Sequence, residues 1–333
     1  MPNKFSGQVY KIHSDFYYVN SNDEIFECKI REVLKKQDQK IYVGDFVDIE
    51  NGYITNIHPR QNFIPRPAAA NVNQVVIVSA VQEPALDFHQ LNRYIAFAEY
   101  YNLDIKLCFN KNDLSSDDKL IEKVFSIYEP LGYDIVFTSA LEGLELDEFE
   151  ELMDGKISVL CGQSGVGKSS LINSLNPEFE LKTKNVSEKT QRGTHTTRHC
   201  EIMKISDRIR IIDTPGFSNL KFDFLLPQDV YKLFREFRPY QNCCKYQNCL
   251  HIHEDGCKIK EDIEKFAPER YKSYLEFVKE ANEYKEKIKY QGKKIESRHK
   301  QNFNKTTVKI STNKRQSSRK TLKQDLYKEL EDE

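Results

Sequence analysis

Residues 161–170 read CGQSGVGKSS, and this stretch decides the fold of the central part of the chain. Gly162 to Ser169 form the pattern G-x-x-x-x-G-K-S, between an apolar run, KISVLCG, and a helical run, SSLINSL. A strand, a glycine-rich turn and a helix in this order are typical of a phosphate-binding loop. The glycines let backbone N–H groups face phosphates, and the helix N-terminus adds positive potential.

The loop predicts contacts to a nucleotide and to Mg²⁺. We expect Lys168 to bridge the β- and γ-phosphates and Ser169 to ligate Mg²⁺. The candidate nucleotide contacts of the loop are Gly162, Gln163, Ser164, Gly165, Val166, Gly167, Lys168, Ser169 and Ser170. Downstream, the segment Asp213-Thr-Pro-Gly216 ends the strand-like run RIRIID. Asp213 would hold Mg²⁺ directly or through water, and the Gly216 N–H would sense the γ-phosphate.

A second motif lies about fifty residues before the phosphate loop, at the end of the apolar run IKLCFN. It consists of Asn110, Lys111, Asn112 and Asp113. Guanine offers a carboxylate two donors, N1–H and N2–H₂, whereas adenine has no such pair, so Asp113 favours GTP over ATP. Asn110 can connect the motif to neighbouring loops, and the Lys111 stem can pack along the base. At the end of the next strand, DIVF, the backbone N–H groups of Ser139 and Ala140 are expected to meet guanine O6.

The segment QRGTHTTRH at 191–199 lies between the phosphate loop and DTPG, where a first switch belongs. Either Thr196 or Thr197 should reach Mg²⁺ and the γ-phosphate; the predicted magnesium ligands are Ser169, Thr197 and Asp213. Many GTPases place a water-orienting Gln after the DxxG turn, but this chain has Phe217. Hydrolysis is then either intrinsically slow or helped by another group. His195 is the candidate, unless it is an ordinary loop residue.

The base-reading motif precedes the phosphate loop, which is a circular permutation of the usual GTPase order. From residue 71 to about 220, apolar strand-like runs alternate with helical runs. This alternation predicts a parallel sheet with helices on both faces. The expected strands are NQVVIVSAV, DIKLCFN, DIVFTSA, KISVLCG and RIRIIDT, and the expected helices are FHQLNRYIAFAEYYN and DDKLIEKVFSIYEPLG. The same sheet can form after permutation because domain termini often lie close together.

The segments on either side of this domain have other patterns. Residues 1–66 contain five short aromatic and β-branched runs separated by turns, which predicts a small β-barrel of the OB type; an SH3-like barrel gives the same pattern. PRPAAA at 65–70 reads as a linker before the GTPase domain at 71–225. A Cys/His cluster and the helical run PERYKSYLEFVKEANEYKEK fall in 226–284. We expect the remaining residues, 285–333, to be a disordered tail.

The tail is strongly basic although the whole chain has a net charge of −1. Residues 285–323 contain fourteen Lys and Arg against two Glu, so the rest of the chain is acidic. Such a segment is typical of an arm that binds nucleic acid, and a solubilising tail is the alternative. No apolar run approaches the ~20 residues of a membrane helix, and the start of the chain lacks a targeting pattern. We therefore expect a cytoplasmic protein that does not enter membranes.

Four of the eight cysteines crowd into residues 243–257. In a reducing cytosol such clustering favours a metal over a disulfide. A permuted GTPase domain behind a small β-barrel and ahead of this cluster closely resembles the ribosome small-subunit-dependent GTPase A family. The resemblance covers roughly residues 1–280. It implies one structural Zn²⁺, held by Cys244, Cys249, His251 and Cys257, with Cys243 and His253 as spare groups.

The resemblance also implies a function. Members bind the small ribosomal subunit late in its assembly, and that subunit stimulates their hydrolysis of GTP to GDP. The barrel and the zinc domain are then the parts that contact rRNA, and His195 matches a proposed catalytic residue. We expect a monomer. Two alternatives stay open: an RNA-binding module that keeps GTP as a static ligand, and a GTPase that regulates a non-ribosomal partner.

Overall fold

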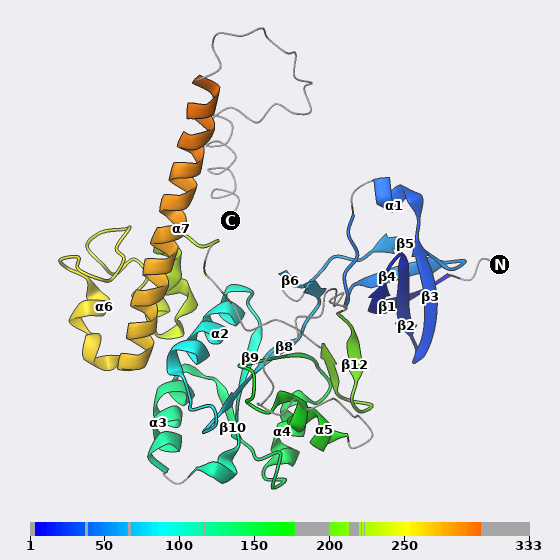
Figure 1. The fold of residues 1–333 in the computed structure, drawn as a ribbon, viewed down its shortest axis with the longest axis horizontal. Helices are drawn as coiled ribbons and strands as arrows, with labels where there is room; N and C mark the ends of the chain where they lie inside the picture. The colour runs from blue at the N-terminus through cyan, green and yellow to red at the C-terminus, as the bar shows by residue number, and fades with distance from the viewer. Residues whose placement is uncertain are drawn as a thin grey trace.

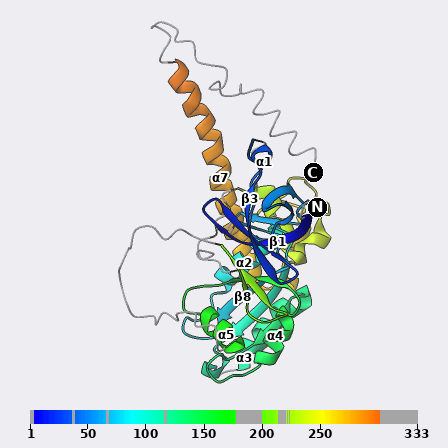
Figure 2. The same cartoon turned by 90° about the vertical axis from the view of Figure 1, so that its right-hand side faces the viewer.

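The structure is a computed structural model with three packed parts (Figure 1). They are an N-terminal barrel in blue, a central α/β domain in cyan and green, and a C-terminal helical part in yellow and orange. In Figures 1 and 2 the barrel and the long last helix lie at the same end of the central domain. The structure describes residues 4–36, 39–65, 68–115, 118–176, 200–212, 220, 222 and 224–300, with side chains up to 289.

The N-terminal part is a closed five-stranded barrel in the order β1-β2-β3-β5-β4. Its elements are β1 (Lys4–His13), β2 (Phe16–Ser21), β3 (Glu24–Ile30), α1 (Glu32–Lys36), β4 (Phe46–Glu50) and β5 (Tyr53–Ile57). Every pair is antiparallel except β3 with β5. Val9, Val19, Val47 and Ile54 are fully buried and fill the interior. The prediction of an OB-type barrel is confirmed.

The segment after the barrel is not the linker that the sequence suggested. β6 (Phe63–Pro65) and β7 (Ala68–Ala70) pair as a two-stranded antiparallel sheet. The Ala70 N–H donates to the Val43 carbonyl over 2.8 Å. Gly44 has φ of +93°, and a Cβ there would lie 1.9 Å from the Ala70 carbonyl oxygen, so only glycine fits. The short sheet therefore fixes the barrel to the start of the central domain.

The central domain contains a six-stranded sheet in the order β10-β9-β8-β11-β13-β12. The strands are β8 (Gln74–Ala80), β9 (Asp104–Asn110), β10 (Asp134–Phe137), β11 (Ile157–Cys161), β12 (Ile202–Lys204) and β13 (Arg210–Ile212). All neighbours are parallel except β12 with β13. The expected parallel sheet is confirmed, and the antiparallel edge strand β12 is an addition. Five carboxyl ends therefore lie along one edge.

Helices cover both faces of this sheet. The helices are α2 (Phe88–Tyr100), α3 (Asp118–Tyr128), α4 (Leu146–Met153) and α5 (Lys168–Leu175). In β8, Val75 and Ile77 pack in the cluster with α2 and α3, whereas Val76 and Val78 pack with α4 and α5. This alternation explains why the strand is apolar throughout, since both of its faces are buried. Helix α4 was not among the expected elements.

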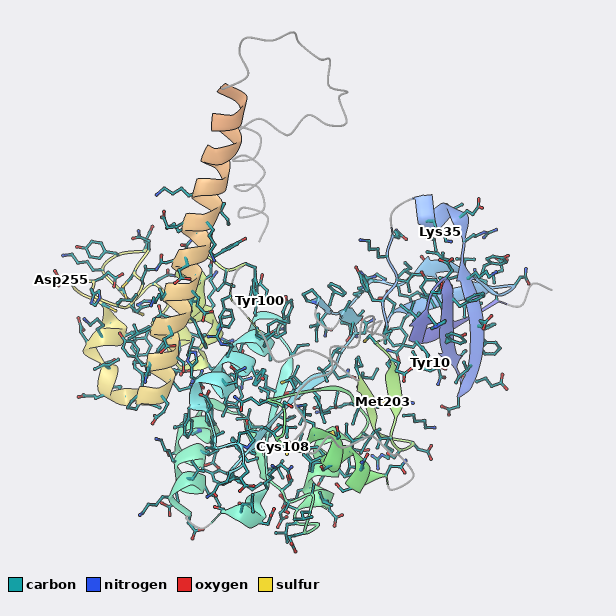
Figure 3. All side chains as sticks on the ribbon, viewed as in Figure 1. Tyr10, Lys35, Tyr100, Cys108, Met203 and Asp255 are labelled. Atoms are coloured by element: carbon teal, nitrogen blue, oxygen red, sulfur yellow. The ribbon has the colours of Figure 1, made fainter. Side chains whose placement is uncertain are left out.

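The barrel contacts the central domain through its first strand. Lys11 of β1 forms a 2.7 Å ion pair with Glu201, the residue before β12. The neighbouring side chains Tyr10 and Ile12 pack against the core of the central domain. Tyr10 is labelled in Figure 3, where it lies on the side of the barrel that faces β12. The barrel and the sheet edge thus share apolar contacts as well as an ion pair.

The C-terminal part packs short helices against one long helix. The elements are η3 (Pro227–Leu233), η4 (Arg235–Tyr240), α6 (Lys258–Glu261), η5 (Ile263–Lys265) and α7 (Pro268–Lys300). Phe234, Phe237, Tyr274 and Phe277 form the centre of its core. The expectation that order ends near residue 285 is wrong for 285–300, because α7 continues to Lys300 (Figure 2). Among the described helices, none is both long and apolar enough to cross a membrane.

Candidate nucleotide-binding site and metal centre

The glycine-rich loop joins β11 to α5 at the carboxyl edge of the sheet. Gly162, Gly165 and Gly167 all have positive φ, at 148°, 85° and 93°. A Cβ at Gly162 would lie 2.0 Å from the Val78 carbonyl oxygen. A Cβ at Gly167 would lie 2.1 Å from the Asn110 side-chain amide. The loop therefore packs so closely against Val78 and Asn110 that a side chain at Gly162 or Gly167 would not fit.

Lys168 lies at the first position of α5 and folds back over the loop. Its Nζ donates to the carbonyl oxygens of Gly162 and Gln163 at 2.9 and 2.7 Å. Burial lowers the pKa of Lys168. Ser169 and Ser170 follow in the first turn of the same helix. A half-buried ammonium beside a helix N-terminus is suited to a polyphosphate, which would replace the two carbonyl contacts.

Asn110 connects three loops of the candidate site. The residue ends β9 and is buried. Its Nδ2 donates to the carbonyl of Val166, in the phosphate loop, over 2.9 Å. Its Oδ1 accepts the Ala140 N–H at 3.1 Å and the Thr138 hydroxyl at 3.3 Å. The base-reading motif, the phosphate loop and the end of β10 are thereby held as one unit.

Asp113 lies in the 3₁₀ turn η1 (Asn112–Leu114), beside the end of β10. The Ser139 hydroxyl donates to its Oδ1 over 2.5 Å. A carboxylate has about four lone-pair positions, so this bond leaves capacity for further donors. The Asn112 N–H donates to the Thr138 carbonyl, and the Asn112 Oδ1 is buried without a hydrogen-bond partner in the described part of the chain. The turn thus presents the Asp113 carboxylate at the edge where the phosphate loop begins.

The Lys111 side chain crosses toward the loop after β8. The residue has φ of +63°, and its Nζ donates to the Glu83 carbonyl. The sequence pattern predicted that the backbone N–H groups of Ser139 and Ala140 contact guanine O6. In the structure both N–H groups donate to acceptors within the protein. They donate to the Leu144 carbonyl and to Asn110 Oδ1, each over 3.1 Å. Sequence spacing could not reveal these internal acceptors.

Five predicted site residues lie outside the described part of the chain. They are His195, Thr196, Thr197, Asp213 and Gly216. β13 ends at Ile212 and pairs in parallel with β11, whose end carries the phosphate loop. β13 therefore ends, at Ile212, on the carboxyl edge that also holds Lys168 and Asp113.

Four side chains converge between η4 and α7 into a candidate metal centre. The donor atoms of Cys244, Cys249, His251 and Cys257 all lie within 4.8 Å of one another. The His251 Nδ1 is 3.5 Å from Cys244 Sγ and 3.4 Å from Cys257 Sγ, and these two sulfur atoms are 4.0 Å apart. Tetrahedral zinc with bonds of about 2.3 Å to sulfur and about 2.1 Å to nitrogen gives donor separations of about 3.6 to 3.8 Å. The donor set therefore fits Zn²⁺ without an open position.

Glu254 organises the loop that carries His251, and the sequence reasoning missed it. Its carboxylate accepts backbone N–H groups of Leu250, Ile252 and His253 at 2.7 to 3.0 Å. Burial opposes ionisation, but these donors outweigh it and lower the pKa of Glu254 to about 2. His251 has φ of +57°, a left-handed conformation that costs energy for this residue type. Glu254 thus stabilises an unfavourable backbone at a candidate ligand.

Two tyrosines from α7 complete the support of this loop. The hydroxyl of Tyr271 donates to the His251 carbonyl over 2.8 Å, and that of Tyr274 donates to the Leu250 carbonyl over 2.6 Å. A spacing of three residues places both hydroxyls on one face of the helix. The loop is therefore held on one side by its own carboxylate and on the other by α7.

Comparison with known proteins agrees with this architecture. The family model described as "RsgA GTPase" matches residues 57–223, and the one described as "RsgA N-terminal domain" matches residues 6–54. A third, "50S ribosome-binding GTPase", matches residues 158–295. A small ribosomal subunit biogenesis GTPase RsgA from Alkaliphilus metalliredigens is 37% identical over 283 residues, which cover 82% of this chain and 97% of that protein. The protein of the same name from Clostridium beijerinckii is 38% identical and covers 83% and 97%.

Solved structures give the same result. YjeQ from Thermotoga maritima superposes with a TM-score of 0.74 at 33% identity, covering 84% of this chain and 98% of that chain. YloQ, described as a circularly permuted GTPase, gives a TM-score of 0.71 at 30% identity, covering 84% and 96%. The fold is therefore shared over most of each chain, and the description of YloQ agrees with the permuted motif order of this sequence. This chain belongs to the RsgA GTPase family.

Proposed function

We propose that the chain hydrolyses GTP to GDP and phosphate during late maturation of the small ribosomal subunit, and that this subunit stimulates the hydrolysis. The observation that carries the proposal is the position of Asn110. Its side chain bonds to the phosphate loop through Val166 and to the end of β10 through Ala140. The motif at 110–113 and the phosphate loop are therefore held together, so that one guanine nucleotide can contact the first with its base and the second with its phosphates. The names of the relatives support the ribosomal role.

Each part of the nucleotide has a proposed partner. Asp113, held by Ser139, accepts the guanine N1–H and N2–H₂ groups. The Lys168 ammonium leaves the loop carbonyls and binds the β- and γ-phosphates. Ser169, together with Thr197 and Asp213, would hold Mg²⁺, which neutralises charge on the phosphates.

Hydrolysis by the isolated protein should be slow. Phe217 follows Gly216 in the sequence and has no group that orients water. His195, in the segment before β12, is the proposed replacement. We propose that contact with the small subunit places this imidazole beside the attacking water. Stimulation by the subunit would then follow from positioning, which contributes a large share of catalysis in phosphoryl transfer.

The other two parts of the molecule supply the proposed contacts to rRNA. The barrel and α7 lie at the same end of the central domain, so one RNA surface could reach both (Figures 1 and 2). A structural Zn²⁺ at Cys244, Cys249, His251 and Cys257 would keep the C-terminal part folded. The basic segment 285–323 adds positive charge for the RNA backbone. We propose that the protein acts as a monomer in the cytoplasm.

An RNA-binding module with a static GTP is the second candidate, and Phe217 is the residue that favours it. Such a module would bind GTP and the subunit without turnover. A GTPase for a non-ribosomal partner is less well supported, because the barrel, the Cys/His part and the basic segment all suit RNA. If the protein captured a partner in a complex that contains no rRNA, that result would favour this alternative.

The deciding experiment measures phosphate release from GTP by the full chain at fixed salt, alone and with purified small or large ribosomal subunits. We expect turnover to rise by at least tenfold with small subunits and to stay unchanged with large ones. Fixed salt matters because binding to RNA weakens steeply with ionic strength. Tight GTP binding without any stimulation would contradict the proposal and favour the static-ligand module. Equal stimulation by both subunits would contradict a specific role in small-subunit maturation.

A further inference from the structure

A small cavity lies between the phosphate loop and the start of α2. The loop contributes Gln163 and Val166 to its lining, and α2 contributes Gln90, Leu91 and Tyr94. A spacing of four residues places Gln90 and Tyr94 on one face of the helix. The Gln90 Nε2 atom and the Tyr94 hydroxyl are both buried and have no hydrogen-bond partner in the described part of the chain. A buried polar group without a partner costs free energy, so these two groups call for a functional explanation.

The two groups lie beside each other without satisfying each other. Tyr94 is 1% exposed, and burial raises the pKa of its hydroxyl to about 12, a rise that the nearby Gln90 side chain partly offsets. The amide is therefore close to the hydroxyl, but the pair does not meet the geometry of a hydrogen bond. A glutamine amide has two N–H donors. Gln90 thus keeps the capacity to donate to an acceptor in the phosphate loop.

The Gln163 carbonyl is an acceptor whose present donor is expected to leave. The Lys168 Nζ donates to this oxygen over 2.7 Å. When Lys168 binds the phosphates, as proposed above, the carbonyl loses that donor. Lys168 also donates to the Gly162 carbonyl, but Gly162 is not among the residues that line the cavity. Gln163 is therefore the residue at which a donor from α2 can take the place of the lysine.

We propose that Gln90 is a positioning residue for the nucleotide: when Lys168 turns to the phosphates, the Gln90 amide donates to the Gln163 carbonyl in its place. This inference rests on the proposed function. The exchange of donors avoids an acceptor without a partner next to the bound phosphates. It also gives the buried Gln90 amide an acceptor. Nucleotide binding thereby satisfies a group of α2, the helix that also contacts α7.

The effect of this contact should depend on the phosphates and not on the base. Both GDP and GTP carry a β-phosphate that draws Lys168 away from the loop carbonyls, so both should depend on Gln90 to the same extent. The base is read at Asp113, on another loop. Loss of the Gln90 amide should therefore weaken GDP and inosine diphosphate, which lacks the guanine N2–H₂ group, by the same factor.

The first experiment is calorimetric titration of the full chain with GDP, inosine diphosphate and a non-hydrolysable GTP analogue. Gln90→Met keeps the length of the side chain but removes its N–H donors. We expect it to weaken all three ligands by about three- to tenfold, the range that corresponds to one hydrogen bond. Gln61→Met is the matched control, since Gln61 is exposed and precedes β6, outside the nucleotide loops. The control should keep the parent affinities.

The second experiment follows the Gln90 amide by NMR in a chain with ¹⁵N-labelled glutamine side chains. The signal is assigned by its absence from Gln90→Met or from Gln90→Asn, so one variant suffices if the other does not fold. We expect GDP to shift an amide proton of Gln90 downfield, because a hydrogen bond deshields the donated proton. In Lys168→Met no lysine occupies the Gln163 carbonyl, so the signal should lie at the shifted position without nucleotide. A purely structural role of Gln90 would produce neither change.

The outcomes separate this inference from the proposed function. A parent chain that binds no guanine nucleotide would overturn both. Equal GDP affinity of the parent and Gln90→Met, or a Gln90 signal that GDP does not move, would overturn only the role of Gln90. If Gln90→Met weakened GDP but not inosine diphosphate, Gln90 would act on the base, and the inference would be wrong.

Discussion

We propose that the choice of nucleotide base depends on the Asp113 carboxylate. It is oriented by the Ser139 hydroxyl on Oδ1, while Asn110 fixes the adjoining backbone against the phosphate loop. Orientation matters because two hydrogen bonds to one purine edge form only when the carboxylate lies in the plane of the base. We therefore propose that Asp113 recognises guanine and that Ser139 and Asn110 support this recognition.

Asp113→Asn should exchange guanine preference for xanthine preference. An amide offers one acceptor and one donor in place of two acceptors, so it faces the N2–H₂ group of guanine unfavourably and matches the O2 of xanthine. We expect GTP affinity to fall by about a hundredfold or more, and xanthosine triphosphate to become the better ligand. Competition titrations with the two triphosphates measure both changes. Unaltered affinities for both would show that Asp113 does not read the base.

Motif spacing indicated two loops, at Asn110 and at Lys168, that the structure brings together at one edge of the sheet. Asn110 and Lys168 are defined by neighbours within a few positions, and short-range patterns of this kind can be read directly from sequence. The roles of Ala140 and Glu254 could not be read in this way. The partner of Ala140 is thirty residues away in Asn110, and the role of Glu254 depends on the left-handed backbone at His251.

Hydrophobic periodicity predicted some of the strands and helices correctly and missed others. Apolar runs predicted β8 and β9 well, because a strand buried on both faces is apolar throughout. The run PRPAAA looked like a linker because Pro and Ala carry little strand signal, yet the backbone of Ala70 bonds to Val43. In α7 the apolar period fades after residue 285 while residues with high helix propensity, such as Lys and Glu, continue. The side chains of 285–289 are exposed, so helix propensity rather than burial accounts for this part of the extension.

At the scale of the Cys/His loop, Glu254→Gln should weaken metal retention. The glutamine amide has one acceptor oxygen, and its NH₂ group would face backbone N–H donors that the carboxylate now accepts. Supporting groups of this kind typically contribute 10- to 100-fold to metal affinity, so we expect a loss of about tenfold or more. Zinc transfer to a chromophoric chelator measures the change.

Asp255→Asn is the matched control for this element. Asp255 adjoins Glu254, is exposed, and lies at the outer edge of the C-terminal part in Figure 3. Its substitution makes the same change of charge without touching the hydrogen bonds of the loop. Equal zinc retention by both variants would mean that Glu254 has no role in holding His251.

For the molecule as a whole, α2 is one of the elements that join the central domain to the C-terminal part. One side of the helix packs on the sheet through Leu91 and Ile95. On the other side, Arg93 forms a bidentate ion pair with Glu280 of α7 at 2.6 and 2.8 Å. The Asn92 amide donates to the Ser273 hydroxyl over 2.9 Å. These bonds would couple a movement of the C-terminal part to α2.

Arg270 holds the centre of this interface and provides a test of it. The side chain is almost fully buried, forms bonds of 2.7 and 2.9 Å to the Glu236 carboxylate, and donates to Asn92 Oδ1 over 3.0 Å. Arg270→Met should lower the free energy of unfolding by about 3–5 kcal/mol, because it leaves the Glu236 charge buried without a partner. Chemical denaturation measures this loss. Lys272→Met, on the exposed side of the same helix, should cost much less.

The double variant Arg270→Met/Glu236→Met separates a buried charge from a lost contact. If the unpaired carboxylate causes the instability, removing it should restore a large part of the free energy of unfolding, since well-packed apolar residues often replace buried ion pairs at little cost. If the double variant stays as unstable as the single one, the contribution of Arg270 lies in its bond to Asn92 and in its packing on the Phe234 ring, 4.6 Å away. GDP affinity should stay at the parent value in the double variant, because neither residue belongs to the nucleotide site. Stimulation of GTP hydrolysis by the small subunit should also be measured in the double variant. A fall in this stimulation while GDP affinity is unchanged would show that the junction of α2 and α7 couples subunit binding to the nucleotide site.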